Sequence, residues 1–429
     1  MDHHTWEHLT EGPPPLLSSA DIDNHVDLLY FTINTACKTH LRKRGVVPGF
    51  NTKWWNKECC TLARQVQREQ DLDTKVTLAR ELKGVIARTK RTWADSYIQE
   101  SCVWEVTAWR HGRKASHIPA LRDEQGVNHY DHATMASMLS ERFFATIGKP
   151  IPLRFSDDLP VHDKREFHPF NTCKLWDLLA STSNMSAPGS SGIRWLLLKK
   201  AWSKINEHLC AIFNACLYLR HHPRVWKEAK VVVIPKPDKP DYSAPKAHRP
   251  ILLLETMSKL LEKAITKRFQ FDLVKYELVP TNQFGRRMYL SCLDTAMTLV
   301  HDVQAAHTGG LKAGMVLFDV KGFFDNINHG RMVAILQSLG FDDFTTKWVR
   351  EFLRDRKVRL SFNCIMSEER TQLVGVPQGL PLSPVLSIIY TLGLLHLMKD
   401  WNNSSLGMYV DDGALFACAD KWADVDKLL

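Results

Sequence analysis

Short apolar runs and amphipathic segments alternate in the C-terminal part of the chain. Apolar runs of strand length lie at 314–320, 407–410 and 414–419, helical spacing is found at 329–340 and 345–355, and a hairpin pattern covers 357–373. The first kind of pattern predicts half-buried strands and the second predicts helices. This part of the chain is therefore predicted to mix strands and helices.

The N-terminal half has a mainly helical pattern. Residues 19–41 place apolar side chains at helical spacing, and residues 56–109 contain no proline and one glycine, so long helices are expected. Residues 228–235 predict a strand that stops at a proline, and residues 258–274 predict an amphipathic helix. The chain is therefore predicted to have an α+β fold that is preceded by a mostly helical N-terminal arm.

Composition and charge narrow the class of protein. With 44% hydrophobic and 24% charged residues, the chain is neither disordered nor fibrous. Its formal net charge is +9, and residues 41–115 hold 16 Lys and Arg against 8 Asp and Glu. This basic arm either binds phosphate groups or is a solvated helix face, and the sequence leaves both readings open. An anionic partner such as nucleic acid is favoured.

Residues 371–398 carry no Asp, Glu, Lys or Arg, a length that could cross a bilayer. Three prolines interrupt its first half, so a helix buried in a domain core is the better interpretation, and no membrane is expected. The ten cysteines form no CxxC pair or zinc spacing, and the polar N-terminus has no secretory pattern, which favours an intracellular protein with reduced thiols.

Two adjacent aspartates, Asp411 and Asp412, interrupt an apolar stretch. Together with Gly413 they predict a tight hairpin turn that projects both acids from one edge of a sheet. An exposed turn of this kind is common without any metal. The second carboxylate group is Asp319, at the C-terminal end of a predicted strand, where a simple strand-end cap is the alternative.

Three carboxylates facing one another could hold hard divalent cations. Mg²⁺ prefers oxygen ligands and leaves positions open for substrate phosphates. Two such ions can clamp the attacking and leaving oxygens of a phosphoryl displacement. The glycine- and proline-rich loop 375–384 leads into a helix that Ser383 would cap, and it could lie against a nucleotide or serve only as a connector.

Together these stretches resemble the palm of a reverse transcriptase. The matching motifs, in the family's order, are "LFDVKGFFDNINH" (317–329), "PQGLPLSP" (377–384) and "YVDD" (409–412). Further motifs resemble non-LTR (LINE-type) retrotransposons: "NTKWWNKEC" (51–59), "SAPGSSGI" (186–193), "VVVIPKPDKP" (231–240), "HRPILLL" (248–254) and "NQFG" (282–285). After residue 285 the chain lacks the family's usual phenylalanine–arginine–proline–glycine continuation.

The resemblance implies an RNA-directed DNA polymerase with a right-hand fold of fingers and a split βαββαβ-like palm. It implies Mg²⁺, with Mn²⁺ as a substitute, and as partners an RNA template, a DNA primer and deoxynucleoside triphosphates. The residues it assigns are Asp319, Asp411 and Asp412 as catalytic metal ligands, Lys236 and Arg249 at the triphosphate, Phe324 under the sugar, and Gln378 and Gly379 in the nucleotide pocket. Asp325 is expected to be structural.

The resemblance also sets expected boundaries: 1–20 a flexible leader, 21–115 the basic arm, 116–185 a helical connector, 186–310 the fingers, 311–429 the palm, and 205–429 the approximate reverse transcriptase domain. The chain ends 17 residues after Asp412, so we expect the thumb to be missing. A separate nuclease is expected upstream in an intact element, and the nucleus is the expected location. The alternatives are a catalytically silent remnant that only binds nucleic acid, and an intron-encoded or RNA-copying polymerase.

Overall fold

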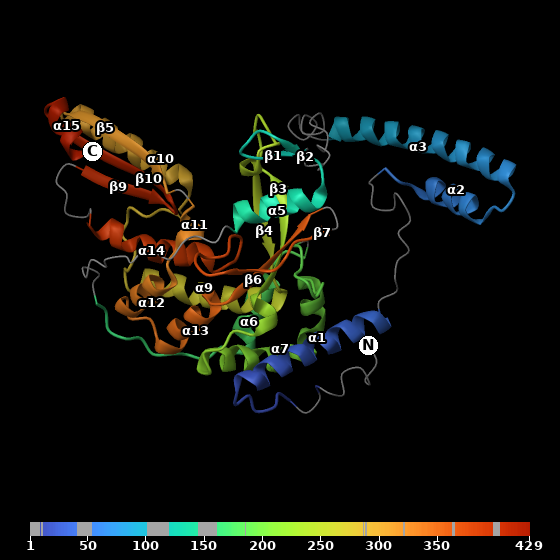
Figure 1. The fold of residues 1–429 in the computed structure, drawn as a ribbon, viewed down its shortest axis with the longest axis horizontal. Helices are drawn as coiled ribbons and strands as arrows, with labels where there is room; N and C mark the ends of the chain where they lie inside the picture. The colour runs from blue at the N-terminus through green and yellow to red at the C-terminus, as the bar shows by residue number, and fades with distance from the viewer. Residues whose placement is uncertain are drawn as a thin grey trace. The chain divides into compact units, whose positions relative to one another are not determined.

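The computed structural model describes residues 9, 12–40, 54–100, 120–144, 161–184, 186–285, 287, 290–320, 322–362, 365–397 and 404–429 (Figure 1). The chain divides into two compact units, residues 37–117 and the remainder. Half of the expected leader, and parts of the expected arm and connector, lie outside the described residues.

The smaller unit is a pair of helices, α2 (Lys57–Arg68) and α3 (Leu72–Glu100). Asn56 caps α2 by accepting a hydrogen bond from the backbone N–H of Cys59, and the contact between the helices buries Cys59 and Val85. Between residues 54 and 100 the sequence holds nine basic and seven acidic residues. The surplus of positive charge predicted for the arm therefore falls mainly in stretches outside the described residues.

The larger unit contains a three-stranded antiparallel sheet with strand order β5-β10-β9. Its strands are β5 (Lys312–Asp319), β9 (Ser404–Tyr409) and β10 (Asp412–Ala419), close to the runs that the sequence predicts. Helices α10 (Cys292–Thr308) and α15 (Trp422–Leu428) pack against this sheet (Figure 1).

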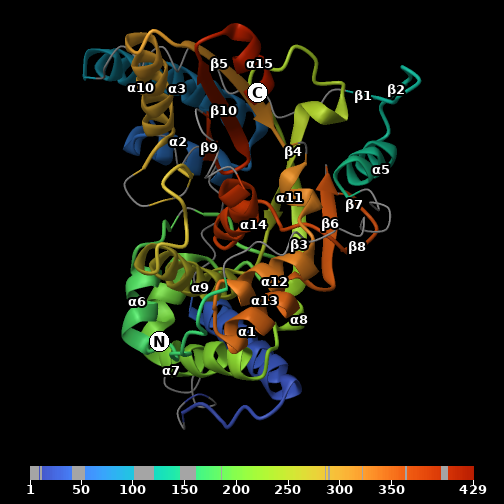
Figure 2. The ribbon, with the colours of Figure 1, turned by 90° about the vertical axis from the view of Figure 1, so that its left-hand side faces the viewer.

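A second, five-stranded sheet has the order β4-β3-β6-β7, with β8 also paired to β6 (Figure 2). Its strands are β3 (Glu228–Pro235), β4 (His248–Leu253), β6 (Arg356–Phe362), β7 (Ile365–Met366) and β8 (Arg370–Gln372). Strand β6 pairs in parallel with β3, from Glu228 opposite Lys357 to Val232 opposite Ser361. The sequence groups residues 356–372 with the expected palm, 311–429. In the structure these residues share a sheet with β3 and β4, which belong to the expected fingers, 186–310. Strands β1 (Leu121–Arg122) and β2 (Asn128–His129) form a separate two-stranded hairpin.

Helices fill the rest of the larger unit around α9 (Thr256–Lys275), which packs against α6 and α14. The other helices are α1 (Ser19–His40), α5 (His132–Phe143), α6 (Thr172–Ala180), α7 (Trp195–Tyr218), α8 (Arg224–Lys227), η2 (Pro245–Ala247), α11 (Phe323–Asn326), α12 (His329–Ser338), α13 (Asp343–Leu353) and α14 (Ser383–Leu397). Helix α14 is the apolar helix expected in the core. Within the described residues, no helix has both the length and the apolar character needed to cross a membrane.

The first helix belongs largely to the larger unit, although the sequence groups residues 21–36 with the basic arm. Its apolar face is buried: Ile22, Val26 and Leu29 have no exposed surface. Two buried hydrogen bonds tie it to later elements, one between the rings of His25 and His208 and one from the indole of Trp226 to the hydroxyl of Tyr30. The burial of apolar side chains, rather than charge, therefore explains why this helix packs in the larger unit.

Glu262 in α9 is fully buried, and burial raises its pKa to about 7 although nearby Arg356 acts in the opposite direction. Because this value lies above the ordinary 4.5, the folded state holds a proton that the unfolded state has lost between those pH values. The contribution to stability is complete below about pH 4.5 and is lost as the pH rises through 7.

We expect Glu262→Gln, which mimics the protonated acid, to raise the free energy of unfolding at pH 8 by up to about 3 kcal/mol, and to change it little at pH 4.5. Urea unfolding at both pH values measures this. The exposed acid variant Glu124→Gln is the control and should follow the wild type. Equal effects of Glu262→Gln at both pH values would contradict the assignment.

Candidate active site

Three carboxylates lie at one end of the three-stranded sheet. Asp319 ends β5 and Asp412 begins β10, and these two residues are direct cross-strand partners. Partners of this kind share a face of the sheet, with Cβ atoms about 5 Å apart. Tyr409 of β9 pairs with Asp412 from the other side, so the row Tyr409, Asp412, Asp319 crosses all three strands. Asp411 stands next to this row in the turn.

The hairpin turn is shorter than the sequence predicts and begins one residue earlier. Because Tyr409 pairs with Asp412, the turn consists of Val410 and Asp411. The prediction of a turn at Asp411, Asp412 and Gly413 is therefore correct for Asp411 and wrong for the other two residues. Gly413 is a strand residue, and the ring of Phe318 on β5 occupies the space where its side chain would lie. The glycine there is explained by this close aromatic contact rather than by a turn.

The charges of the three acids act on one another. Partial burial is the main cause that raises the pKa of Asp411, and the negative charges of Asp412 and Asp319 raise it further. Asp411 is half-buried, whereas Asp319 and Asp412 are exposed. In the described part of the chain, no three His, Cys, Asp or Glu side chains lie close enough together to form a ready-made metal-ligand cluster.

A divalent cation fits this donor set chemically. Carboxylate oxygens are the ligands that Mg²⁺ and Mn²⁺ prefer. The repulsion that raises the pKa of Asp411 is the kind of interaction that a bound cation removes, since it favours the ionised acids. Asp319, Asp411 and Asp412 are the residues that would hold the ion.

Phe324 lies in α11, five residues after Asp319, the last residue of β5. Of the two adjacent phenylalanines, Phe323 is buried and packs near Tyr390, whereas Phe324 is half-buried. This settles which ring faces the core and leaves Phe324 as the ring with accessible surface. Asp325 is a residue of α11, and its backbone N–H donates a hydrogen bond to the carbonyl of Gly322 at the start of this helix.

The loop after β8 packs directly on α11. The N–H of Val376 donates to the carbonyl of Phe324 at 2.7 Å, and the N–H of Gly375 donates to that of Ile327 at 2.9 Å. His329 Nε2 donates to the carbonyl of Gly375. The hydroxyl of Ser383, expected as a helix cap, closes the loop by donating to the carbonyl of Pro377. The loop position is therefore fixed relative to α11.

Gln378 and Gly379 follow in this loop, half-buried and exposed respectively. Gly379 lines a cavity of about 420 Å³ between the loop, α6 and α9. Lys263 and Lys267 of α9 line the same cavity, and neither has a carboxylate partner among the described residues. Burial lowers the pKa of Lys263, and the positive charges of Lys199 and Lys267 lower it further.

Lys236 and Arg249 lie at the end of the β3–β4 hairpin where the loop connects the two strands. Arg249 is exposed and pairs with Ile234, while Lys236 follows the last residue of β3 and donates its N–H to the carbonyl of Ala247. The sequence predicts both at a triphosphate. Nothing in the described contacts joins their side chains to the three carboxylates, so these two assignments stay predictions.

A further segment lies near the site, and from the sequence we predict nothing for it beyond the family resemblance of its NQFG motif. The segment 282–285 hydrogen-bonds along β9 and reaches the Val410–Asp411 turn through Gln283. Gln283 is completely buried. The NQFG motif draws attention to this segment. No local sequence pattern could indicate that the segment contacts residues more than 120 positions later in the chain.

Residues 234–425 match the family model described as reverse transcriptase (RNA-dependent DNA polymerase). The chain thus carries a reverse transcriptase domain, and this domain contains every site residue named above. The wider similarity is to proteins of non-LTR retrotransposons.

The chain is 28% identical over 288 residues to a probable RNA-directed DNA polymerase from transposon BS of Drosophila melanogaster, covering 65% of this chain and 32% of the relative. It is 22% identical over 446 residues to the retrovirus-related Pol polyprotein from type-1 retrotransposable element R1 of Bradysia coprophila, covering 96% and 42%. A solved apo telomerase from Candida tropicalis, truncated from its C-terminal domain, matches 47% of this chain and 45% of that chain, with 14% identity and a TM-score of 0.33. The chain spans about a third of the length of the curated relatives it matches.

Proposed function

We propose that this chain is an RNA-directed DNA polymerase that adds deoxynucleotides to a DNA 3′-hydroxyl. The observation that carries the proposal is the placement of Asp319 and Asp412 as cross-strand partners with Asp411 beside them, inside a domain of the reverse transcriptase family. The three-stranded sheet would be the palm, and the hairpin of β3 and β4 would belong to the fingers.

The three carboxylates would bind Mg²⁺, which activates the primer 3′-hydroxyl and neutralises the leaving pyrophosphate. Asp319 and Asp412 would orient the reacting groups from neighbouring strands, and Asp411 would do so from the turn. Lys236 and Arg249 would bind the triphosphate of the incoming nucleotide.

The accessible ring of Phe324 would lie beneath the sugar and exclude a 2′-hydroxyl by its bulk. Gln378 and Gly379 would line the nucleotide pocket, because their loop packs on the same short helix as Phe324. These roles give the enzyme its selectivity for deoxynucleotides. An upstream nuclease in the intact element and action in the nucleus complete the proposal.

The cavity beside Gly379 supports contact with a nucleic-acid strand. Two lysines of α9 that have no carboxylate partner among the described residues lie one helical turn apart, about 6 Å along the helix, and present positive charge next to the proposed nucleotide loop. Phosphate groups would relieve the mutual repulsion that these lysines experience.

We expect the double variant Lys263→Gln/Lys267→Gln to bind single-stranded RNA more weakly. For two lost phosphate contacts, the slope of log K against log salt should fall by about 1.4. Fluorescence anisotropy at several salt concentrations measures both quantities. Lys200→Gln/Lys204→Gln, on exposed positions of α7 away from the cavity, removes the same charge and should leave the slope unchanged. Equal slopes for both double variants would exclude the contact.

The experiment that tests the proposal compares RNA and DNA templates and deoxy- and ribonucleoside triphosphates in primer extension. The proposal predicts extension on RNA with deoxynucleotides, and much weaker incorporation of ribonucleotides. Preferential ribonucleotide incorporation would instead identify an RNA-copying polymerase. RNA binding without any extension would identify a silent remnant.

A further inference from the structure

The segment 282–285 adds to the free edge of β9. The N–H of Phe284 donates to the carbonyl of Met408 at 2.8 Å, and the N–H of Met408 donates to the carbonyl of Asn282 at 2.9 Å. The side-chain amide of Asn282 donates to the carbonyl of Leu406. This short parallel pairing holds the strand that leads into the Val410–Asp411 turn.

Val410 has a backbone conformation that needs such support. Its φ is 65°, in the left-handed region that a β-branched residue rarely adopts. A strained residue of this kind costs about 1–3 kcal/mol and persists only when its surroundings fix it. Any relaxation of Val410 would move its neighbour, Asp411.

Gln283 supplies the contacts that fix this conformation. Its side-chain oxygen accepts hydrogen bonds from the N–H of Val410 at 3.3 Å and from the N–H of Gly285 at 3.0 Å. Its side-chain nitrogen donates to the hydroxyl of Thr391 on α14 at 3.5 Å. One buried amide therefore connects the turn, its own segment and a core helix.

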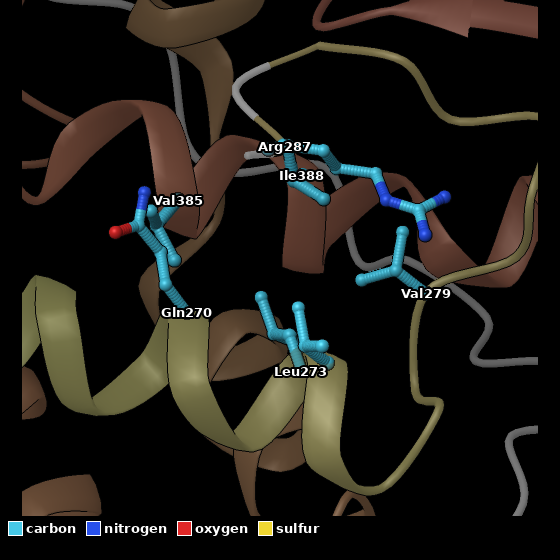
Figure 3. A pocket seen from close by; sticks show the side chains of 7 residues that line it. Gln270, Leu273, Val279, Arg287, Val385 and Ile388 are labelled. Atoms are coloured by element: carbon cyan, nitrogen blue, oxygen red, sulfur yellow. The ribbon is translucent and has the colours of Figure 1, made fainter. Parts of the chain in front are cut away.

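The residues that follow Gln283 pack closely against the Val410–Asp411 turn or hold the segment in place. A Cβ on Gly285 would lie 2.5 Å from the nitrogen of Val410 and 2.7 Å from its side chain, so only glycine lets the turn pack there. Arg287 donates to the carbonyls of Pro280 at 3.1 Å and Gln283 at 3.4 Å. Figure 3 shows this arginine beside the cavity between α9 and α14.

We propose that Gln283 is a positioning residue that sets the place of Asp411 by holding the N–H of Val410. This inference rests on the proposed function, because the position of Asp411 matters only if this carboxylate binds the metal ion of a polymerase. Without the acceptor oxygen, Val410 would return toward an ordinary conformation, and Asp411 would move away from its place beside Asp319 and Asp412.

The test is titration with Mn²⁺, followed by the paramagnetic resonance of the free ion in the absence of nucleotides and primer. We expect Gln283→Met to weaken Mn²⁺ binding about tenfold. In a Val410→Gly background, where the turn conformation carries no strain, the same replacement should cost at most about twofold. This coupling distinguishes positioning from general destabilisation.

The matched control is Asn282→Ala, which removes a side-chain amide from the same segment but leaves the bond to Val410. It should bind Mn²⁺ like the wild type. Equal affinity of the wild type and Gln283→Met, an undiminished loss in the Val410→Gly background, or no Mn²⁺ binding by the wild type would each overturn the inference. Failure of primer extension with these ion affinities intact would overturn only the proposed function.

Discussion

Asp411→Asn is expected to lower the rate of primer extension at least about a thousandfold, which corresponds to roughly 4 kcal/mol of transition-state stabilisation. Asparagine keeps the size of the side chain but removes the negative charge that would bind the cation. In the proposed site the three acids would act as a unit, so Asp319→Asn should produce a loss of similar size, and the double variant should lose little more.

Single-turnover extension at saturating nucleotide measures this effect. The control is Asp420→Asn, which removes an exposed acid just beyond the opposite end of β10. It should extend at the wild-type rate, and circular dichroism should show that both variants keep the fold. An Asp411→Asn variant that extends at a rate within threefold of the wild type would contradict the assignment of this residue.

Gly375→Ala is expected to destabilise the protein by about 3 kcal/mol or more. Gly375 is buried with φ +84°, and a Cβ there would lie 2.7 Å from the carbonyl oxygens of both Phe324 and Asp325. These are backbone atoms of α11 and cannot move aside cheaply. The left-handed conformation adds about 1–2 kcal/mol for a non-glycine residue.

Urea unfolding compares this variant with Gly126→Ala. Gly126 has a similar φ of +86°, but a Cβ there would have no neighbour within 4 Å. The control should therefore lose only about 1 kcal/mol, from its backbone conformation. The difference between the two variants measures how tightly the loop is packed on α11, and equal losses would mean that α11 accommodates the added methyl group.

The sequence identifies the site elements well where the pattern is local. Short apolar runs next to acids predict β5 and the β9–β10 hairpin, and the apolar stretch before residue 398 predicts α14. The helix covers only the second half of that stretch, from Ser383 beside the last proline onward, as the sequence indicates. These signals depend on neighbouring residues and so can be read without a structure.

Features that depend on distant contacts could not be predicted. The pair Asp412–Gly413 favours a turn locally, but the ring of Phe318 requires the glycine inside the strand. The parallel pairing of β3 with β6 joins residues about 130 positions apart, and Gln283 reaches Val410 across 127. In each case the deciding partner lies far along the chain, where a local pattern carries no information.

The measurement that tests the account most directly is primer extension on an RNA template by the purified chain, with Mg²⁺ varied from zero upward. We predict deoxynucleotide addition that requires Mg²⁺ or Mn²⁺, stops when the ion is chelated, and is lost in both Asp319→Asn and Asp411→Asn. Extension that persists in both variants would contradict the central claim, because the three carboxylates would then have no part in the chemistry.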